Sequence, residues 1–325
     1  MVVPSCNDGH YDWAKEVKEF DDTKAGVKGL VDAGVPKLPR LFVHPPETLR
    51  SHPKLDGVNL DLPTIDLQGL RARRGEVVEE IRRAAGEWGF FRIVNHGVPL
   101  ETMDAMLAAV KRFHEQPTRG EDALFVDNQM HICRKEVQQY VKYMIELREI
   151  MAELLSEAMG LRSDYLSSIE CMKSEALACL YYPKCPEPEK TLGTPKHSDT
   201  TFLTLLMQDS TGGLQILHDD HWVDVPPVRG ALIANIGDLM QIISNDKFIS
   251  VEHRVVAQPV GPRISVACFF TPSLKAAAKP FAPIEELLSD ENPAAYREFM
   301  FREYTQHYKT KGEKVETALL HYKIR

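Results

Sequence analysis

The sequence predicts a mainly β fold with α-helical flanks, namely a double-stranded β-helix of the jelly-roll, cupin-like type. Short runs rich in β-branched and aromatic residues alternate with turns through the second half of the 325-residue chain. Antiparallel strands at this turn spacing are typical of a jelly roll. The first expected strand begins at Ala176, and later strands are expected at 201–207, 214–217, 231–236, 253–256 and 264–270.

Apolar residues at helical spacing predict helices on both sides of these strands. The pattern occurs at 76–88 and 100–114, in a long amphipathic stretch at 133–161, and again at 293–307. These elements divide the chain into four expected parts. They are an N-terminal domain at 1–132, a connecting helical region at 133–172, a jelly-roll core at 173–275 and a C-terminal helical extension at 276–325.

The composition is that of an intracellular protein that acts on small molecules. A formal net charge of −8 and a pI near 5.9 argue against nucleic acid as a partner, because its binding proteins present a basic face. No apolar run approaches the roughly 20 residues of a membrane helix, and the N-terminus lacks the features of a secretory signal. The six cysteines are irregularly spaced, as reduced thiols are. We therefore expect a cytoplasmic monomer with no membrane contact.

Three residues are candidate ligands of a catalytic metal. His197 and Asp199 lie two residues apart at the start of an expected strand, so their side chains leave the same face. His253, at the head of a β-branched run, is the candidate third ligand. Two imidazoles and one carboxylate leave other octahedral positions open, as in non-haem Fe(II) oxygenases. Open positions indicate catalysis, because a structural zinc site closes its shell with four protein ligands.

A second His-x-Asp pattern competes with this assignment. His218 and Asp220 match it, but they lie in a polar run between two apolar stretches, which is typical of a hairpin turn. We therefore expect His218 to be a turn residue. His96, in the N-terminal part, is also expected to serve packing or a turn rather than a metal.

Arg263 and Ser265 are candidates for binding a carboxylate near the metal. They follow His253 closely and share one face of the strand expected at 264–270. A guanidinium presents a planar fork suited to a carboxylate, and a hydroxyl two residues away can donate to the same group. The pair would hold the far carboxylate of a keto-diacid whose other end chelates the metal.

Several motifs occur in a fixed order along the chain. They are Tyr181-Tyr182-Pro183-x-Cys185-Pro186, His197-x-Asp199, Asn235-Ile236-Gly237-Asp238, Ser250-Val251-Glu252-His253-Arg254-Val255 and Arg263-x-Ser265. This series closely resembles the plant 2-oxoglutarate- and Fe(II)-dependent dioxygenases. The segments 62–67 and 88–98 are similar to the N-terminal domain of the same family.

The resemblance implies a role for each candidate residue. The metal of the three ligands would be Fe(II), and Arg263, Ser265 and Tyr182 would contact 2-oxoglutarate as co-substrate. Leu180 stands where many members carry an Asn that also touches the co-substrate, so this chain lacks that amide. Molecular oxygen and a small molecule would be the other substrates, and ascorbate the reductant.

The substrate is expected to be a small plant specialised metabolite that the enzyme hydroxylates. The chain most resembles the homologues of 1-aminocyclopropane-1-carboxylate oxidase, a subgroup that includes dioxygenases acting on benzoxazinoid glucosides. A benzoxazinoid glucoside is therefore one candidate. The ethylene-forming 1-aminocyclopropane-1-carboxylate oxidases are the alternative. They begin almost at the motif matching 62–67, and the long stretch that precedes this motif here disfavours them.

One segment is shorter than the resemblance predicts. Only residues 119–132 separate the stretches matching 113–118 and 133–137, where family members usually place some tens of residues. By resemblance, the first barrel strands and part of the pocket wall are missing. A sheet without its edge exposes unpaired backbone groups and invites aggregation. A truncated, catalytically impaired member that acts as a binding or regulatory protein is therefore a second alternative.

Overall fold

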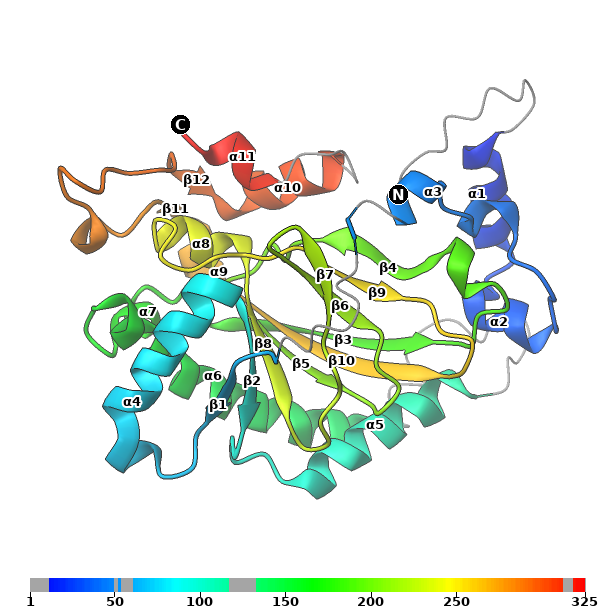
Figure 1. Ribbon diagram of the computed structural model, residues 1–325, viewed down its shortest axis with the longest axis horizontal. Helices are drawn as coiled ribbons and strands as arrows, with labels where there is room; N and C mark the ends of the chain where they lie inside the picture. Colours follow the sequence, from blue (N-terminus) through cyan, green and yellow to red (C-terminus); the bar gives the residue numbers. More distant parts are fainter. Residues whose placement is uncertain (1–11, 50–51, 54–60, 117–132, 312–317, 325) are drawn as a thin grey trace.

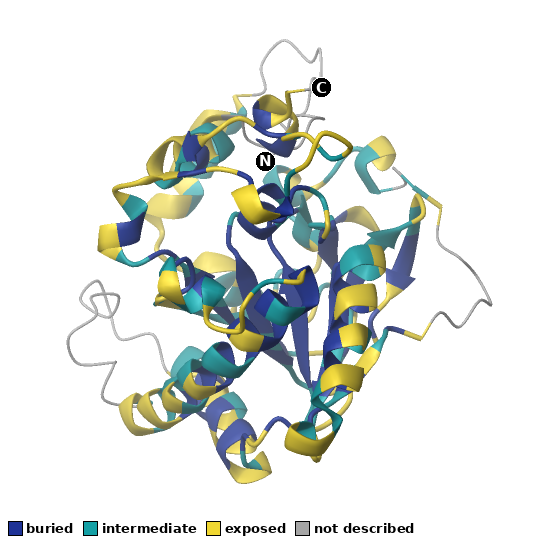
Figure 2. Ribbon diagram, turned by 90° about the vertical axis from the view of Figure 1, so that its left-hand side faces the viewer, coloured by how far each residue is buried: buried dark blue, intermediate teal, exposed yellow. Residues whose placement is uncertain are grey.

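Two antiparallel sheets form the centre of the molecule, and helices surround them (Figure 1). The computed structural model describes residues 12–49, 52–53, 61–116, 133–311 and 318–324. Buried residues concentrate in the strands and on the inner sides of the helices, while the outer helix faces are exposed (Figure 2). The expected jelly-roll arrangement of two facing sheets is therefore present.

The larger sheet has six strands and carries the main hydrophobic core on its outer face. One parallel pair, β1 with β2, extends an otherwise antiparallel sheet. In spatial order the strands are β1 (Thr64–Asp66), β2 (Phe90–Val94), β8 (Leu232–Ile236), β5 (Leu203–Gln208), β10 (Arg263–Thr271) and β3 (Ser174–Tyr182).

Three long helices pack against this sheet. They are α4 (Leu70–Arg83), which continues through a π-helical turn at Ala84–Trp88, α5 (Leu100–His114) and α6 (Arg134–Met159). Their buried residues join those of the strands in one core cluster. Burial of this apolar surface stabilises the fold at roughly 25 cal/mol per Å².

The smaller sheet has four strands and closes the barrel. In spatial order they are β4 (Leu192–His197), β9 (His253–Val256), β6 (Leu214–His218) and β7 (His221–Asp224). A second, smaller apolar cluster lies between the sheets and includes Phe90, Ile216, Ile233 and Val255. The barrel interior is therefore lined mainly by apolar side chains from both sheets.

Short elements flank the two ends of the barrel (Figure 1). At one end lie α1 (Trp13–Asp22), α2 (Gly26–Asp32), a 3₁₀ turn at Arg40–Phe42 and α3 (Pro46–Leu49). At the other end lie α7 (Tyr165–Ser168), α8 (Asp238–Ile243), α9 (Leu274–Ala277), β11 (Pro280–Phe281), β12 (Phe299–Met300), α10 (Phe301–Lys311) and α11 (Ala318–Tyr322). Within the described ranges, no helix is long and apolar enough to cross a membrane.

The expectation of a mainly β chain is wrong in its proportions. The structure is mixed, with about 42% helix and 22% strand, because short helices such as α1, α2 and α8 add to the helices that the sequence pattern suggested. The helix expected at 100–114 coincides with α5. The helix expected at 293–307 begins only at Phe301, because the residues before it include strand β12.

β3 ends the larger sheet in the part of the chain that the structure describes. It pairs with β10 along its full length, from Ser174 opposite Thr271 to Tyr182 opposite Arg263. On its other edge the Cys179 carbonyl accepts a hydrogen bond from the His114 ring. The shortened segment at 119–132, expected to lack strands for this edge, lies outside the described residues.

Candidate metal and co-substrate site

The three predicted metal ligands converge at one point of the smaller sheet. His197 ends β4, His253 begins β9, and these two residues are register partners in adjacent strands. The Nε2 atom of each imidazole lies 3.7 Å from Oδ1 of Asp199. Within the described ranges, these three form the one group of at least three His, Cys, Asp or Glu residues able to share a metal, with ligand atoms within 4.8 Å of one another.

Asp199 lies in the loop after β4, so the expectation that it belongs to a strand is wrong. Its backbone carbonyl accepts a hydrogen bond of 2.8 Å from the Asp238 N–H instead of pairing with a neighbouring strand. The preceding residue, Ser198, donates its hydroxyl to the Asp238 carboxylate at 3.1 Å. These bonds hold residues 198–199 in a loop outside the sheet, and the Asp199 side chain still faces the two imidazoles.

Both imidazoles are held with Nε2 facing the common point. Nδ1 of His197 lies 2.8 Å from the Pro195 carbonyl, and Nδ1 of His253 lies 3.2 Å from the Val251 carbonyl. A carbonyl oxygen can only accept, so each Nδ1 carries the proton and each Nε2 presents a lone pair. The sequence did not identify these acceptors, because they are backbone atoms.

The Asp199 carboxylate is oriented by two donors from the larger sheet. Oδ2 accepts from the Thr204 hydroxyl at 2.6 Å and from the Asn235 amide at 2.8 Å, so Oδ1 is left facing the imidazoles. Burial alone would raise the pKa of Asp199, but the two imidazoles and these hydrogen bonds lower it below its ordinary value. The ionised carboxylate is the form that a cation requires.

The donor set fits a divalent transition metal. Burial, together with the neighbouring His197, lowers the pKa of His253 to about 4, so its ring is neutral at physiological pH. The Phe90 ring packs edge-on against His253 at 5.2 Å and shields it from water. Two imidazoles and one carboxylate form the facial set that Fe(II) oxygenases use.

Asp238 connects the ligand segments to α10. Its fully buried carboxylate accepts hydroxyl hydrogen bonds from Ser198, from Ser250 at 2.7 Å and from Tyr304 of α10 at 2.7 Å. Burial raises the pKa of Asp238 to about 6. A second α10 hydroxyl, that of Tyr308, donates to the Ser198 carbonyl. The sequence contained Asp238 in a recognised motif, but its partners lie far along the chain.

Arg263 opens β10 and is 1% exposed inside the barrel. Its Nε donates to the Gly212 carbonyl at 2.6 Å, Nη1 to the Ser265 hydroxyl at 2.9 Å and Nη2 to the Gln208 amide oxygen at 3.0 Å. A guanidinium has five N–H groups, so one on each Nη atom remains available. The expected shared face of Arg263 and Ser265 is therefore present, with a fixed fork.

Residues of β3 complete the wall beside this fork. Tyr182 lies opposite Arg263, with the guanidinium carbon 5.0 Å from its ring centre and its hydroxyl 2.9 Å from that of Thr194. Leu180 lies opposite Ser265 in the same register, so it occupies the interior position where many family members carry an Asn. The wall here is apolar apart from the tyrosine hydroxyl.

Of the competing candidates, Asp220 lies in the expected hairpin turn, whereas His218 is the last residue of β6 and pairs with His221, so the expectation that it is a turn residue is wrong by one position. Asp219 and Asp220 have φ values of 46° and 60°, and they connect β6 to β7. His218 is half-buried because its ring stacks on Trp88 at 3.8 Å. His96 binds the Gly230 carbonyl through Nε2 and accepts from the Val98 N–H, so it shapes a turn.

Two family matches cover most of the chain. Residues 173–272 match the 2OG-Fe(II) oxygenase superfamily, and residues 62–146 match the N-terminal region described as a non-haem dioxygenase in morphine synthesis. The chain is 42% identical to 1-aminocyclopropane-1-carboxylate oxidase homolog 1 of Arabidopsis thaliana, over 95% of this chain and 96% of that protein. It is 43% identical to homolog 6 of the same plant, over 97% and 99%.

Solved structures agree with this relationship. JOX2 in complex with 2OG, Fe and JA has a TM-score of 0.78 and 28% identity, covering 92% of this chain and 97% of JOX2. The rice dioxygenase for auxin oxidation has a TM-score of 0.68 and 25% identity, covering 81% and 100%.

The relatives also contain positions that this chain lacks. The alignment with homolog 1 runs over 349 positions and so exceeds the 325 residues of the whole chain. The 95% of the chain that is aligned amounts to about 309 residues, which leaves about 40 positions of the 349 without a counterpart. Even so, the intact His197, Asp199 and His253 site lies within the matched region. This chain belongs to the 2-oxoglutarate- and Fe(II)-dependent oxygenases, in the group of 1-aminocyclopropane-1-carboxylate oxidase homologues.

Proposed function

We propose that the protein hydroxylates a small plant specialised metabolite, with 2-oxoglutarate anchored by Arg263, Ser265 and Tyr182. The observation that carries this proposal is the Arg263 fork, which is fixed by Gly212, Ser265 and Gln208 and keeps one N–H on each Nη atom outside those three bonds, in the same barrel as the metal ligands. A dicarboxylate spanning from fork to metal would neutralise the buried guanidinium. Burial already lowers the pKa of Arg263, so a bound anion would be favourable.

The anchor residues have distinct tasks. Arg263 donates two parallel hydrogen bonds to the far carboxylate, and the Ser265 hydroxyl, which accepts from Arg263, keeps its own hydrogen for the same carboxylate. Tyr182 closes the wall and excludes water from the fork. When bound, iron and 2-oxoglutarate supply the oxidising power for inserting oxygen into a C–H bond, and ascorbate would keep the metal reduced.

The interior near the metal supports a substrate with an apolar or aromatic portion. Phe90 contacts His253, and Trp88, stacked on His218, packs against the same interior cluster. The related JOX2 structure contains JA beside 2OG and Fe, and the rice relative oxidises auxin. Both relatives support a small molecule as the substrate here. A benzoxazinoid glucoside is the candidate suggested by the family resemblance.

A substrate screen tests the proposal. The purified protein, with Fe(II), 2-oxoglutarate and ascorbate in air, is incubated with plant phenolics, hormone acids and benzoxazinoid glucosides, and both succinate and hydroxylated product are measured. Asp199→Ala serves as the inactive control. We expect one class to give product and succinate in equal amounts. Turnover of 1-aminocyclopropane-1-carboxylate with ascorbate and bicarbonate, without any need for 2-oxoglutarate, would favour the ethylene-forming alternative.

The truncated, impaired form remains a second candidate for one specific reason. The alignment with homolog 1 has 349 positions and includes about 309 residues of this chain. About 40 positions of the relative therefore have no counterpart here. If those positions supply part of the pocket wall, 2-oxoglutarate would still bind while substrate turnover is lost. Binding of 2-oxoglutarate without product from any substrate class is the outcome that favours this candidate.

A further inference from the structure

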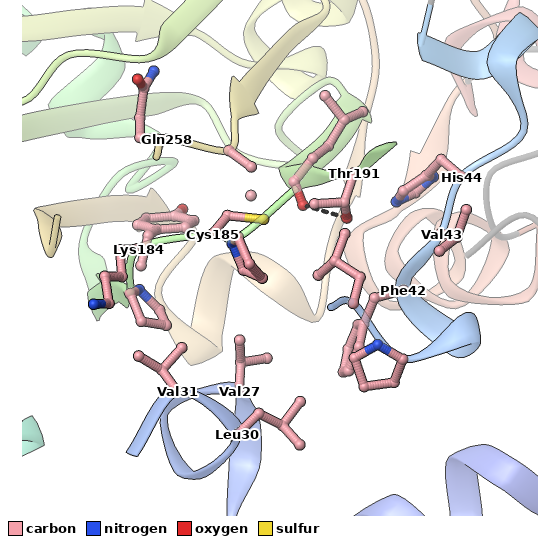
Figure 3. Close-up of a pocket in the computed structure, with 18 of the residues that line it drawn as sticks. Val27, Leu30, Val31, Phe42, Val43, His44, Lys184, Cys185, Thr191 and Gln258 are labelled. Atoms are coloured by element: carbon pink, nitrogen blue, oxygen red, sulfur yellow. Dashed lines mark hydrogen bonds between the residues drawn. The ribbon is translucent and has the colours of Figure 1, made fainter. Parts of the chain in front are cut away.

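A cavity of about 380 Å³ lies between the N-terminal helices and the end of the barrel (Figure 3). Its volume falls in the range of about 300–1,000 Å³ that small-molecule sites occupy. On one side, Val27, Leu30 and Val31 of α2 point into it. On the other side lie the Pro-rich segment 183–186 and parts of β4 and β9. No metal ligand lines it, but Arg263 and Tyr182 of the proposed co-substrate anchor form part of its wall.

The apolar side of α2 is only partly covered in the described part of the chain, where Leu30 and Val31 are half-buried. The helix contains no buried residue, and Val27 is 47% exposed although it faces the cavity. Exposed apolar surface is unfavourable by roughly 25 cal/mol per Å². A ligand with an apolar body would cover this surface and the opposing side chains of Phe42, Leu192 and Val256.

The charged residues around the cavity favour a ligand of negative charge. Among the described residues that line it, none is acidic, while Lys37, Lys184 and Arg263 are cations. This bias runs against the composition, because the chain has 47 acidic residues and 39 Lys and Arg. Lys184 is exposed at the rim and forms no ion pair with any residue that the structure describes. The site therefore favours an anion.

We infer that this cavity binds a small organic acid with an apolar body that is neither the substrate nor the co-substrate of the reaction. The carboxylate would lie at the Lys184 rim and the apolar body under α2. Arg263 and Tyr182 line this cavity and also form the proposed co-substrate anchor. Binding of the acid is therefore expected to change the affinity for 2-oxoglutarate by a few-fold, and 2-oxoglutarate should change the affinity for the acid by the same factor. The site is thus placed for regulation by an apolar acid.

Octanoate is a suitable probe, and octan-1-ol and octylamine are its uncharged and cationic controls. Calorimetry on the full-length protein, with Mn(II) and saturating 2-oxoglutarate, should rank their affinities as octanoate, octanol, octylamine. Trp13 lines the cavity, so its fluorescence should change on octanoate binding, and Trp13→Phe should remove that change. If the apparent Kd of octanoate rises in proportion to the concentration of 2-oxoglutarate, octanoate competes for the co-substrate anchor, and the inference is overturned.

Two variants test the cavity itself. Val31→Phe fills it and should weaken octanoate binding by about 10-fold or more through steric exclusion. Lys184→Glu should weaken octanoate by about 2- to 5-fold, as expected for an exposed charge pair, and should spare octanol. Lys142→Glu makes the same charge change on an exposed position of α6 and should have no effect. Equal octanoate affinity in all three variants, each shown to be folded by circular dichroism, would refute the site.

Discussion

Replacement of Arg263 by Lys tests the proposed co-substrate anchor. The charge is retained, but the planar fork is lost. Arg263 uses three N–H groups to fix itself against Gly212, Ser265 and Gln208, and the proposed anchor uses the remaining two. An ammonium group on a shorter reach cannot keep these three contacts and also present two parallel donors.

The size of the effect follows from the hydrogen bonds that are lost. One hydrogen bond to a charged group contributes about 1.5–3 kcal/mol, which corresponds to a loss of roughly 10- to 100-fold in 2-oxoglutarate affinity. The Gly212 carbonyl also loses its donor at 2.6 Å. A buried acceptor without a partner costs about 1–3 kcal/mol of folding stability, so a lower midpoint of urea unfolding is expected as well.

Anaerobic calorimetry with 2-oxoglutarate measures the affinity, and a separate metal titration should show no change. Arg162→Lys makes the same replacement at an exposed position and is the matched control. If Arg263→Lys binds 2-oxoglutarate as tightly as the natural chain does, the fork is not the anchor. A loss of metal binding in this variant would show that the damage is general.

Further predictions concern pH, α10 and the short segment. Folding lowers the pKa of His253 from 6.5 to about 4, so the metal-free protein should lose stability as the pH falls from 6.5 to 4, by at most about 1.4 kcal/mol per pH unit. Denaturant titrations at several pH values should show that the free energy of unfolding depends less steeply on pH in His253→Gln. Tyr304→Phe removes a 2.7 Å donor to Asp238 and should lower stability by about 1.5–3 kcal/mol while weakening Fe(II) binding; no change in either would contradict the positioning role. Restoring family length between Thr118 and Cys133 should raise soluble yield and the ratio of product to succinate, and equal values would show that the span is dispensable.

The local pattern of the sequence predicted much of the site. The two-residue period of a strand placed Arg263 and Ser265 on one face, and β10 confirms it. The same period predicted the convergence of His197 and Asp199, but for a wrong reason, because Asp199 lies in a loop held by Asp238. The predicted convergence of His197 and Asp199 is still correct, because the hydrogen bonds to Asp238 hold the Asp199 side chain on the same side as His197.

Contacts between distant segments could not be read from the sequence. The acceptors of the two ligand imidazoles are backbone carbonyls, which any residue type supplies. Gln208 and Gly212 contact Arg263 only because β5 and the following loop lie beside β10. The cavity under α2 likewise depends on how a short helix lies against β4 and β9, and the sequence analysis expected no helix there.

Anaerobic titration of Fe(II) into three proteins, each with 2-oxoglutarate, tests the central assignment most directly. The signal is the visible charge-transfer absorption that appears when a keto acid chelates Fe(II). The natural chain and His218→Ala should develop it with equal affinity, because His218 stacks on Trp88 and is not one of the three converging ligands. Asp199→Ala should show almost none, because it loses the carboxylate that lies 3.7 Å from both imidazoles. Equal signals in the two variants, or a loss confined to His218→Ala, would contradict the assigned metal site.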